Sequence, residues 1–181
     1  KDTNDVLSLM EYSQKNSVPL LARGGGSSQC GQTVGESVVL DYSKHQNKIL
    51  ELNVEEKYVW VQPGVVLDHL NDYLKPHGLW FPVDVSTSSR ATIGGMSANN
   101  SCGSRSLYYG NMVHNVLAIE AILDDGSIFQ FDQINKNYLA TKNNQDRLYK
   151  IIDKFIDVRQ KVGSEIDANW PTTQRRVGGY N

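Results

Sequence analysis

The stretch ARGGGSSQCG, residues 22–31, places three consecutive glycines and two serines directly after the apolar run VPLL (18–21). Such a run is either a tight turn, because glycine adopts positive φ freely, or a phosphate loop whose backbone N–H groups face an anion. Two common nucleotide motifs are excluded, since Gln29 stands where G-x-G-x-x-G needs its third glycine and no Gly-Lys-Ser/Thr triplet occurs. The link to the next apolar run, SVVLDY (37–42), is too short and polar for a crossover helix. We therefore expect loop amides alone, without a helix N-terminus, to hold any anion.

A second segment, FPVDVSTSSRATIGGMSANNSCGSRSLYYGN (81–111), favours the ligand interpretation. It is rich in Ser, Thr, Asn and Gly, and a structureless loop of this length in a compact domain usually wraps a ligand or is disordered. Its apolar residues, among them Ile93, Met96 and Leu107, argue against disorder. We expect residues 23–31 and 81–111 to embrace one elongated polar ligand.

The hydrophobic pattern predicts an α+β fold. The strands are too closely linked in sequence for helical crossovers, so this class is preferred to a doubly wound parallel sheet. The first expected elements are a helix capped by Asn4 and strands at 18–23, 36–42, 48–53 and 57–64. A helix at 65–78 follows, with Leu67, Leu70 and Leu74 at helical spacing, and then a hairpin at 115–131 that turns at Asp125–Gly126. A last helix fits the spacing of Leu148, Ile151, Ile152, Phe155 and Val162.

Composition and charge exclude several classes of function. The chain has 181 residues and a formal net charge of −2 without long like-charge runs, so we expect no nucleic-acid partner. Its two cysteines, Cys30 and Cys102, cannot form a disulfide framework or a four-cysteine metal site. No apolar run is long enough to span a bilayer, and we expect a cytoplasmic protein, with peripheral attachment to the inner membrane as the alternative. The start without Met and the end at RRVGGYN lead us to expect a piece of a longer protein.

The order of these motifs resembles the FAD-binding domain of the vanillyl-alcohol oxidase/p-cresol methylhydroxylase superfamily. The resemblance rests on ARGGGSSQCGQ, SVVLDYSK, KILELN, ATIGGMSANNSCGSRSLYYGN and VLAIEAILDDG, in that order. Within the superfamily the chain is similar to the D-lactate, glycolate and D-2-hydroxyglutarate dehydrogenase branch. The segments LKPHGLWFPVDVSTS, NNSCGSRS, YGNMVHNV and RRVGGYN are similar to large bacterial D-2-hydroxyglutarate dehydrogenases that fuse a flavin domain to an iron–sulfur region.

The resemblance implies a type-4, p-cresol methylhydroxylase-like fold of two small α+β subdomains, 1–62 and 63–181, with FAD between them and a substrate domain outside this chain. It places the pyrophosphate loop at 23–31 and the flavin-wrapping segment at 81–111. The implied FAD-binding residues are Arg23, Gly24, Gly25, Gly26, Ser27, Ser28, Gln29, Pro82, Asp84, Ser86, Thr92, Gly94, Gly95, Asn99, Asn100, Ser101, Gly103, Ser104 and Gly110.

The implied activity is oxidation of a D-2-hydroxy acid by hydride transfer to flavin N5, with the catalytic residues, the electron acceptor and any iron–sulfur cluster outside this chain. Covalent members carry a histidine where this chain has Ser27–Ser28, and no cysteine lies near Arg90, so we expect non-covalent FAD. A further flavin-binding stretch of the family lies beyond residue 181. We therefore expect the isolated chain to bind FAD weakly or not at all, and to have no turnover.

Two other functions stay open: an oxidase or reductase of the same superfamily with another substrate, and a non-catalytic FAD module of an electron-transfer complex. Among single side chains, Arg105 could meet an anion or pair with an acid. Trp60, Trp80 and Phe81 could stack on a flavin or pack in the fold. We expect structural or solvent-facing roles for His45, His69, His77 and His114, and turn or core roles for Asp41 and Gly64.

Overall fold

The computed structural model describes residues 1–133 and 147–173. The sequence match at RRVGGYN, residues 175–181, lies outside them. Contacts between described residues divide the chain into two compact units, one of Lys1–Val116 with Asp124–Gly126, the other of Leu117–Leu123 with most of the chain after residue 126. The boundary that we expect between the two FAD-binding subdomains, at 62/63, stays a prediction.

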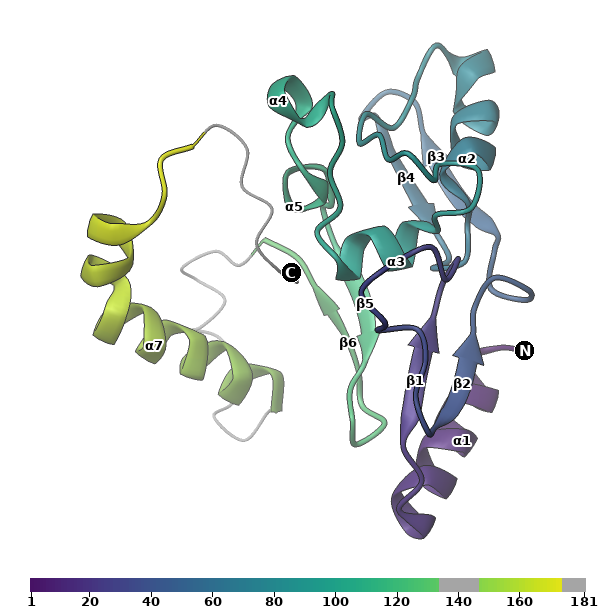
Figure 1. Cartoon of the computed structure of the whole chain (residues 1–181), viewed down its shortest axis with the longest axis vertical. Coiled ribbons are helices and arrows are strands. Elements are labelled where there is room, and N and C mark those ends of the chain that lie inside the picture. The colour runs from purple at the N-terminus through teal and green to yellow at the C-terminus, as the bar shows by residue number, and fades with distance from the viewer. Residues whose placement is uncertain (134–146, 174–181) are drawn as a thin grey trace. The chain divides into compact units, whose positions relative to one another are not determined.

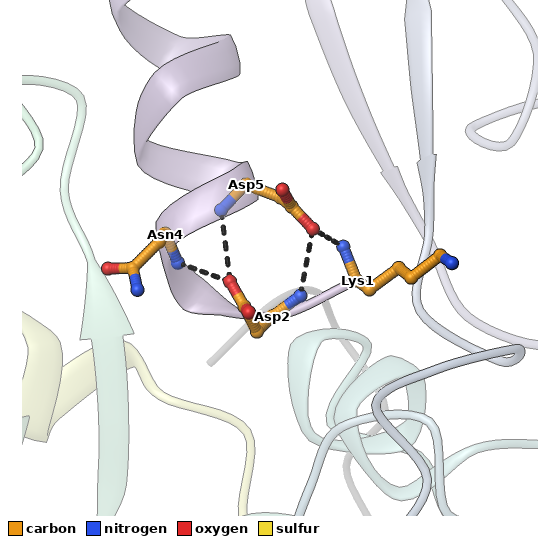
Figure 2. A network of polar contacts seen from close by, with 4 residues as sticks. All are labelled: Lys1, Asp2, Asn4 and Asp5. Carbon is orange, nitrogen blue, oxygen red and sulfur yellow. Dashed lines mark hydrogen bonds and ion pairs between the residues drawn. The ribbon is translucent and has the colours of Figure 1, made fainter.

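The first unit begins with helix α1 (Thr3–Asn16). The Asp2 carboxylate accepts hydrogen bonds from Asn4 N at 2.9 Å and Asp5 N at 3.2 Å, and Asp5 in return accepts one from Asp2 N (Figure 2). This reciprocal capping box makes Asp2 the N-cap. The expectation of Asn4 in that role is wrong because the acidic pair Asp2 and Asp5 satisfies the first amides two residues earlier.

Strands β1 (Leu20–Arg23) and β2 (Val38–Asp41) pair in parallel, in the register Leu20↔Val38 to Arg23↔Asp41. Parallel neighbours need a long connection, and residues 24–37 make it here without a helix. The glycine loop therefore begins at the carboxyl end of β1 and has to travel back along the pair (Figure 1).

Strands β3 (Ile49–Asn53) and β4 (Tyr58–Val61) form an antiparallel pair, with a register irregularity between Ile49 and Glu51. Helix α2 (Leu67–Leu74) follows, and the short 3-10 helix η1 (Lys75–His77) ends at Gly78 with φ 69°. Leu67, Leu70 and Leu74 are all buried. The predicted helix and its closing glycine are therefore confirmed, and the three leucines at helical spacing form its buried face.

The core of the first unit consists of two clusters that share α2. Leu67 packs with Val83, Ala91, Met96 and Met112. Leu70 and Leu74 pack with Val65, and the partly buried side chains of β3 and β4 cover them. Because one helix supplies both clusters, it ties the β3–β4 hairpin to the segment that follows Pro82.

The segment 81–111, which we expect to be a long ligand-wrapping loop, has secondary structure of its own. It contains α3 (Ile93–Ala98) and α4 (Ser106–Tyr109), and α5 (Met112–Asn115) follows directly. These helices are too short to show a hydrophobic period. Burial of Met96 and Met112 in the core, rather than helix propensity, holds the segment in place.

The second unit contains the hairpin of β5 (Ile119–Ile122) and β6 (Ile128–Phe131), confirmed around a turn in which Gly126 has φ 83°. It also contains the long helix α7 (Arg147–Asn169). The predicted last helix is therefore confirmed; Leu148 and Ile152 are buried in it, whereas Phe155 is 73% exposed. With one parallel and two antiparallel strand pairs in the described residues, the α+β class is confirmed.

Candidate cofactor site

Gly24 and Gly25 pack directly on the second polar segment. A Cβ atom on Gly24 would overlap Thr92 Oγ1, and one on Gly25 would overlap the carbonyl oxygen of Arg90. The loop after β1 thus runs against the start of α3 (Figure 1). What the glycine backbone approaches within the chain is the segment 90–95, so the two segments are brought together as we expect.

Gly26 serves a different need. Its φ is 64°, and a Cβ there would lie 2.5 Å from Nη2 of Arg23. A side chain would be strained at this positive φ and would displace the guanidinium. Gly26 therefore turns the loop while the Arg23 side chain lies across the turn.

The loop keeps a set of backbone donors free. Within the described residues, none of the N–H groups of residues 24–29 donates a hydrogen bond to another group of the chain. Residues 24–28 are half-buried, so these donors are partly shielded from water. Ser27 Oγ lies 3.4 Å from Thr87 Oγ1, which joins the loop to the second segment again. Several adjacent N–H groups without internal acceptors suit an acceptor-only ligand such as a phosphate.

Helix α3 begins beside the glycine loop, although it does not follow the loop in sequence. Thr92 is buried and caps α3, accepting from Gly95 N at 3.4 Å. The first amides of α3 are already used: Ile93 N donates to Val65 O at 2.8 Å and Gly94 N to Pro63 O at 2.9 Å. The donors left for an anion therefore come from the loop rather than from these two helix amides.

Asp84 organises the far end of the second segment. Its carboxylate accepts hydrogen bonds from Ser104 Oγ at 2.8 Å and from Arg105 N at 3.0 Å. A Cβ on Gly103 would overlap the carbonyl oxygen of Asp84, so this close approach requires glycine. Burial alone would raise the pKa of Asp84, but the bonds from Ser104 and Arg105 outweigh it and lower the pKa below its ordinary value.

Several other predicted site residues make contacts elsewhere in the first unit, and no contact of theirs with the glycine loop is seen in the described residues. Asn100 has φ 47° and accepts from Val113 N at 3.1 Å, Gly94 packs on Pro63, and Gly110 packs on His114. Ser101 N donates to Met96 O, Ser86 is exposed, and Pro82 lines a separate pocket of about 280 Å³ that reaches Trp80. The contact of these residues with FAD stays a prediction.

Gln32 and Thr87 are contacts that sequence reasoning missed. Gln32 Nε2 donates to Asn99 Oδ1 at 3.4 Å, and Thr87 meets Ser27. Gln32 Oε1 is buried and has no hydrogen-bond partner in the described residues. No periodicity marks either residue; the one available signal was position, since Thr87 lies in the second polar segment and Gln32 directly follows the first.

In the part of the chain that the structure describes, the Arg105 guanidinium makes no ion pair with Asp84, although its charge helps to lower the pKa of that carboxylate. The guanidinium lies over Trp80, 5.1 Å from the ring centroid, and Tyr109 meets the same ring edge-on at 5.1 Å. Trp80 is thereby used in aromatic packing within the unit, although 43% of it is exposed.

The remaining single residues have local roles. Asp41 accepts from Ser43 N at 3.0 Å and Ser43 Oγ at 2.6 Å, and the hydroxyl bond is the main reason its pKa is lowered. Gly64 N donates to Gln46 O at 2.7 Å. Asp41 thus has a turn role, and Gly64 lies in a turn and packs on the backbone of Tyr42 and Gln46. In the part of the chain that the structure describes, no three His, Cys, Asp or Glu side chains are placed to hold a metal ion, and no helix has the length and apolarity to cross a membrane.

Comparison with known proteins identifies the family. A family model described as "FAD binding domain" matches residues 1–132. D-2-hydroxyglutarate dehydrogenase of Pseudomonas putida is 35% identical over 99% of this chain and 18% of its own length, and that of Escherichia coli is 36% identical over 97% and 17%. The chain thus spans less than a fifth of the length of these relatives.

A solved structure shares the fold. The structure of 6-hydroxy-D-nicotine oxidase from Arthrobacter nicotinovorans has a TM-score of 0.66 with this chain, at 18% identity, and the match covers 76% of this chain and 30% of that one. The chain therefore belongs to the FAD-binding domain family of flavoenzymes.

Proposed function

We propose that this chain is the cofactor-holding part of a flavin-dependent dehydrogenase that oxidises a D-2-hydroxy acid. The observation that carries the cofactor assignment is the glycine loop, which packs on residues 90–95 and leaves the amides of residues 24–29 without acceptors in the described residues. The support for the substrate class is the set of relatives, whose names include D-2-hydroxyglutarate, D-lactate and glycolate enzymes.

The residues of this chain would bind and orient the cofactor. The amides of 24–29 and the hydroxyls of Ser27 and Ser28 would donate to the pyrophosphate, because phosphate oxygens only accept. The segment from Pro82 to Ser104, closed on itself by Asp84, would present backbone and small polar groups along the rest of the molecule. When bound, FAD supplies hydride acceptance at N5. Substrate binding and proton abstraction belong to residues outside this chain.

We further propose that FAD is held without a covalent bond. Ser27 and Ser28 are poor attachment groups, and none of the four histidines lies in the loop. Flavin should therefore leave the protein completely on acid precipitation, whereas colour that stays with the pellet would contradict this proposal. Cys30 and Cys102 are free thiols, which fits a place in the reducing cytoplasm.

The first test is a visible spectrum of the purified chain before FAD addition, after it, and after desalting. We expect saturable but weak FAD binding, measured as quenching of flavin fluorescence, and loss, on desalting, of most of the flavin absorption at ~450 nm.

The control is a chain extended to the length of its relatives. It should keep stoichiometric FAD, and its flavin should be reduced by D-2-hydroxyglutarate but not by the L-enantiomer. Failure of both proteins to bind FAD, with a cooperative thermal transition intact, would overturn the cofactor assignment. FAD retention without reduction by any D-2-hydroxy acid would overturn the substrate class alone.

A further inference from the structure

The connection between β1 and β2 contains two buried polar atoms that no described residue satisfies. They are Gln32 Oε1 and Ser37 Oγ, and they are the complete set of such side-chain atoms in the part of the chain that the structure describes. A hydroxyl such as that of Ser37 both donates and accepts hydrogen bonds, whereas a carboxamide oxygen only accepts them. Gln32 Oε1 therefore specifies the kind of partner that it needs, which is a hydrogen-bond donor.

Gln32 is held in place by its backbone and by its side-chain nitrogen. It lies in the turn that Val34 N closes by donating to Gly31 O at 3.2 Å, and Gly31 has a φ of 82°. The side-chain nitrogen Nε2 donates to Asn99 Oδ1 at 3.4 Å, and Asn99 is the C-cap of α3. Because the turn fixes the backbone and Asn99 takes the nitrogen, the oxygen at the end of the side chain is left buried and unpaired.

The same connection carries the free donors of the proposed phosphate site. At the N-terminal end of α3, Gly24 packs on the N-cap Thr92, and the unpaired amides of residues 24–29 follow in the described structure. At the C-terminal end, Gln32 meets Asn99. Helix α3 has six residues, so its two ends lie about 9 Å apart. The connection therefore offers donors beside one end of α3 and an acceptor beside the other.

These two kinds of group suit different parts of one ligand. Phosphate oxygens only accept hydrogen bonds and carry negative charge, so they suit the amides of the loop but not a carboxamide oxygen. In FAD the pyrophosphate joins the ribityl chain to the adenosine ribose, and both of these carry hydroxyl groups that donate. A sugar hydroxyl is therefore the donor that lies nearest to the phosphates on either side.

We propose, on the basis of the cofactor assignment above, that Gln32 is a cofactor-binding residue whose side-chain oxygen accepts a hydrogen bond from a sugar hydroxyl of FAD beside the pyrophosphate. Without the cofactor this oxygen is buried and unsatisfied, which is unfavourable, and the bound hydroxyl removes that penalty. Gln32 thus contributes to binding and not to the stability of the flavin-free fold. A glutamine with a purely structural role would do the opposite.

The first measurement is the melting temperature of the flavin-free 181-residue chain. Gln32→Met keeps the length of the side chain and replaces an unsatisfied polar group by an apolar one, so the melting temperature should stay the same or rise. Gln14→Met is the matched control, the same change at an exposed position on α1, and should leave the melting temperature nearly unchanged. A clear fall for Gln32→Met alone would show a structural role through Asn99 and would overturn the proposal.

The second measurement is calorimetric titration of FAD into the chain extended to the length of its relatives and freed of flavin. Gln32→Met should weaken FAD binding about three- to tenfold, the effect of losing one hydrogen bond, and Gln14→Met should bind as the wild type does. FMN, which carries the ribityl chain, and ADP, which carries the ribose, distinguish the two sources of the hydroxyl. The affinity for one of them should fall by the same factor, while the affinity for the other stays unchanged.

The outcomes separate this proposal from the cofactor assignment. Equal FAD affinity of Gln32→Met and the wild type would overturn the role of Gln32 and leave the cofactor assignment intact. Weaker binding of both FMN and ADP, or of neither, would also overturn it, because one hydroxyl belongs to one sugar. A wild-type protein that binds no FAD would overturn the cofactor assignment and, with it, the role of Gln32.

Discussion

At the scale of single residues, the glycine run is explained first by packing and only then by a ligand. Gly24 and Gly25 have no space for a Cβ because Thr92 and the Arg90 carbonyl oxygen stand against them. The absence of side chains thereby joins two segments that lie far apart in sequence. The free amides of residues 24–29 are a consequence of the same conformation, because a loop pressed against its neighbour cannot fold back to satisfy its own donors.

The first prediction concerns Gly25. In Gly25→Ala the new methyl group meets a backbone carbonyl, which cannot rotate aside, so the free energy of unfolding should fall by about 1–3 kcal/mol in a urea titration. Gly35→Ala is the matched control in the same loop, where the nearest atom to a new Cβ is Ser37 Oγ at 3.8 Å, and it should change stability by less than about 0.5 kcal/mol. Equal stability of the two variants would show that residues 25 and 90 are not in contact.

The second prediction concerns Asp84, whose folded pKa is lowered although burial opposes this. A lowered folded pKa means that the carboxylate stabilises the fold above the unfolded pKa, near ~3.9, and loses this contribution as the pH falls through the folded value. Asp84→Asn should therefore reduce the free energy of unfolding by about 1 kcal/mol at pH 7, with the difference shrinking at acidic pH. Asp72→Asn, at an exposed position on α2, serves as the control and should change the free energy of unfolding by less than about 0.5 kcal/mol at pH 7.

At the scale of elements, short helices are held by their surroundings. Helix α3 has six residues and contains two glycines, so it is too short to be stable alone. Its N-cap Thr92 is buried between the glycine loop and the core, and its Met96 is buried on the inner side. The helix therefore exists because its cap and its one large side chain are both fixed by packing.

The third prediction tests this cap. Thr92→Val keeps the shape of the side chain but removes the acceptor for Gly95 N, and should destabilise the protein by about 1 kcal/mol in thermal or urea unfolding. Thr92→Ser keeps the hydroxyl and should retain the cap. The account of α3 would be wrong if Val were tolerated better than Ser.

At the scale of the whole molecule, the first unit is tied together through α2. Leu67 belongs to the cluster that includes the start of α3, and Leu70 and Leu74 belong to the cluster beneath β3 and β4. A substitution in this helix should therefore weaken the packing of both clusters, including the segment that carries the proposed cofactor contacts.

The fourth prediction follows from that arrangement. Leu70 is 0% exposed, and Leu70→Ala should lower the free energy of unfolding by about 2–5 kcal/mol through lost burial and a residual cavity. Leu107 on α4 is 60% exposed, so Leu107→Ala should be close to neutral. A Leu70→Ala variant with wild-type stability would contradict the assignment of α2 to the core.

Much of the fold could be predicted because its elements carry local signals. Three leucines at helical spacing before Pro76 and Gly78 predicted α2, and the apolar runs around Asp125–Gly126 predicted the β5–β6 hairpin. These predictions succeed because the period of the side chains and the φ preferences of glycine and proline act over a few residues. Phe155 shows the limit of such signals: a helical period shows that a face is apolar but not whether anything covers it.

The sequence by itself determined the α+β class, the two polar segments and, through their order, the family to which the chain belongs. Only the tertiary structure decided that Gly24 and Gly25 press on residues 90–92, and that α3 forms with its first amides already used. The physical reason is that these features depend on contacts between residues distant in the chain. Steric overlap, hydrogen-bond satisfaction and burial are properties of the assembled fold, and no local spacing encodes them.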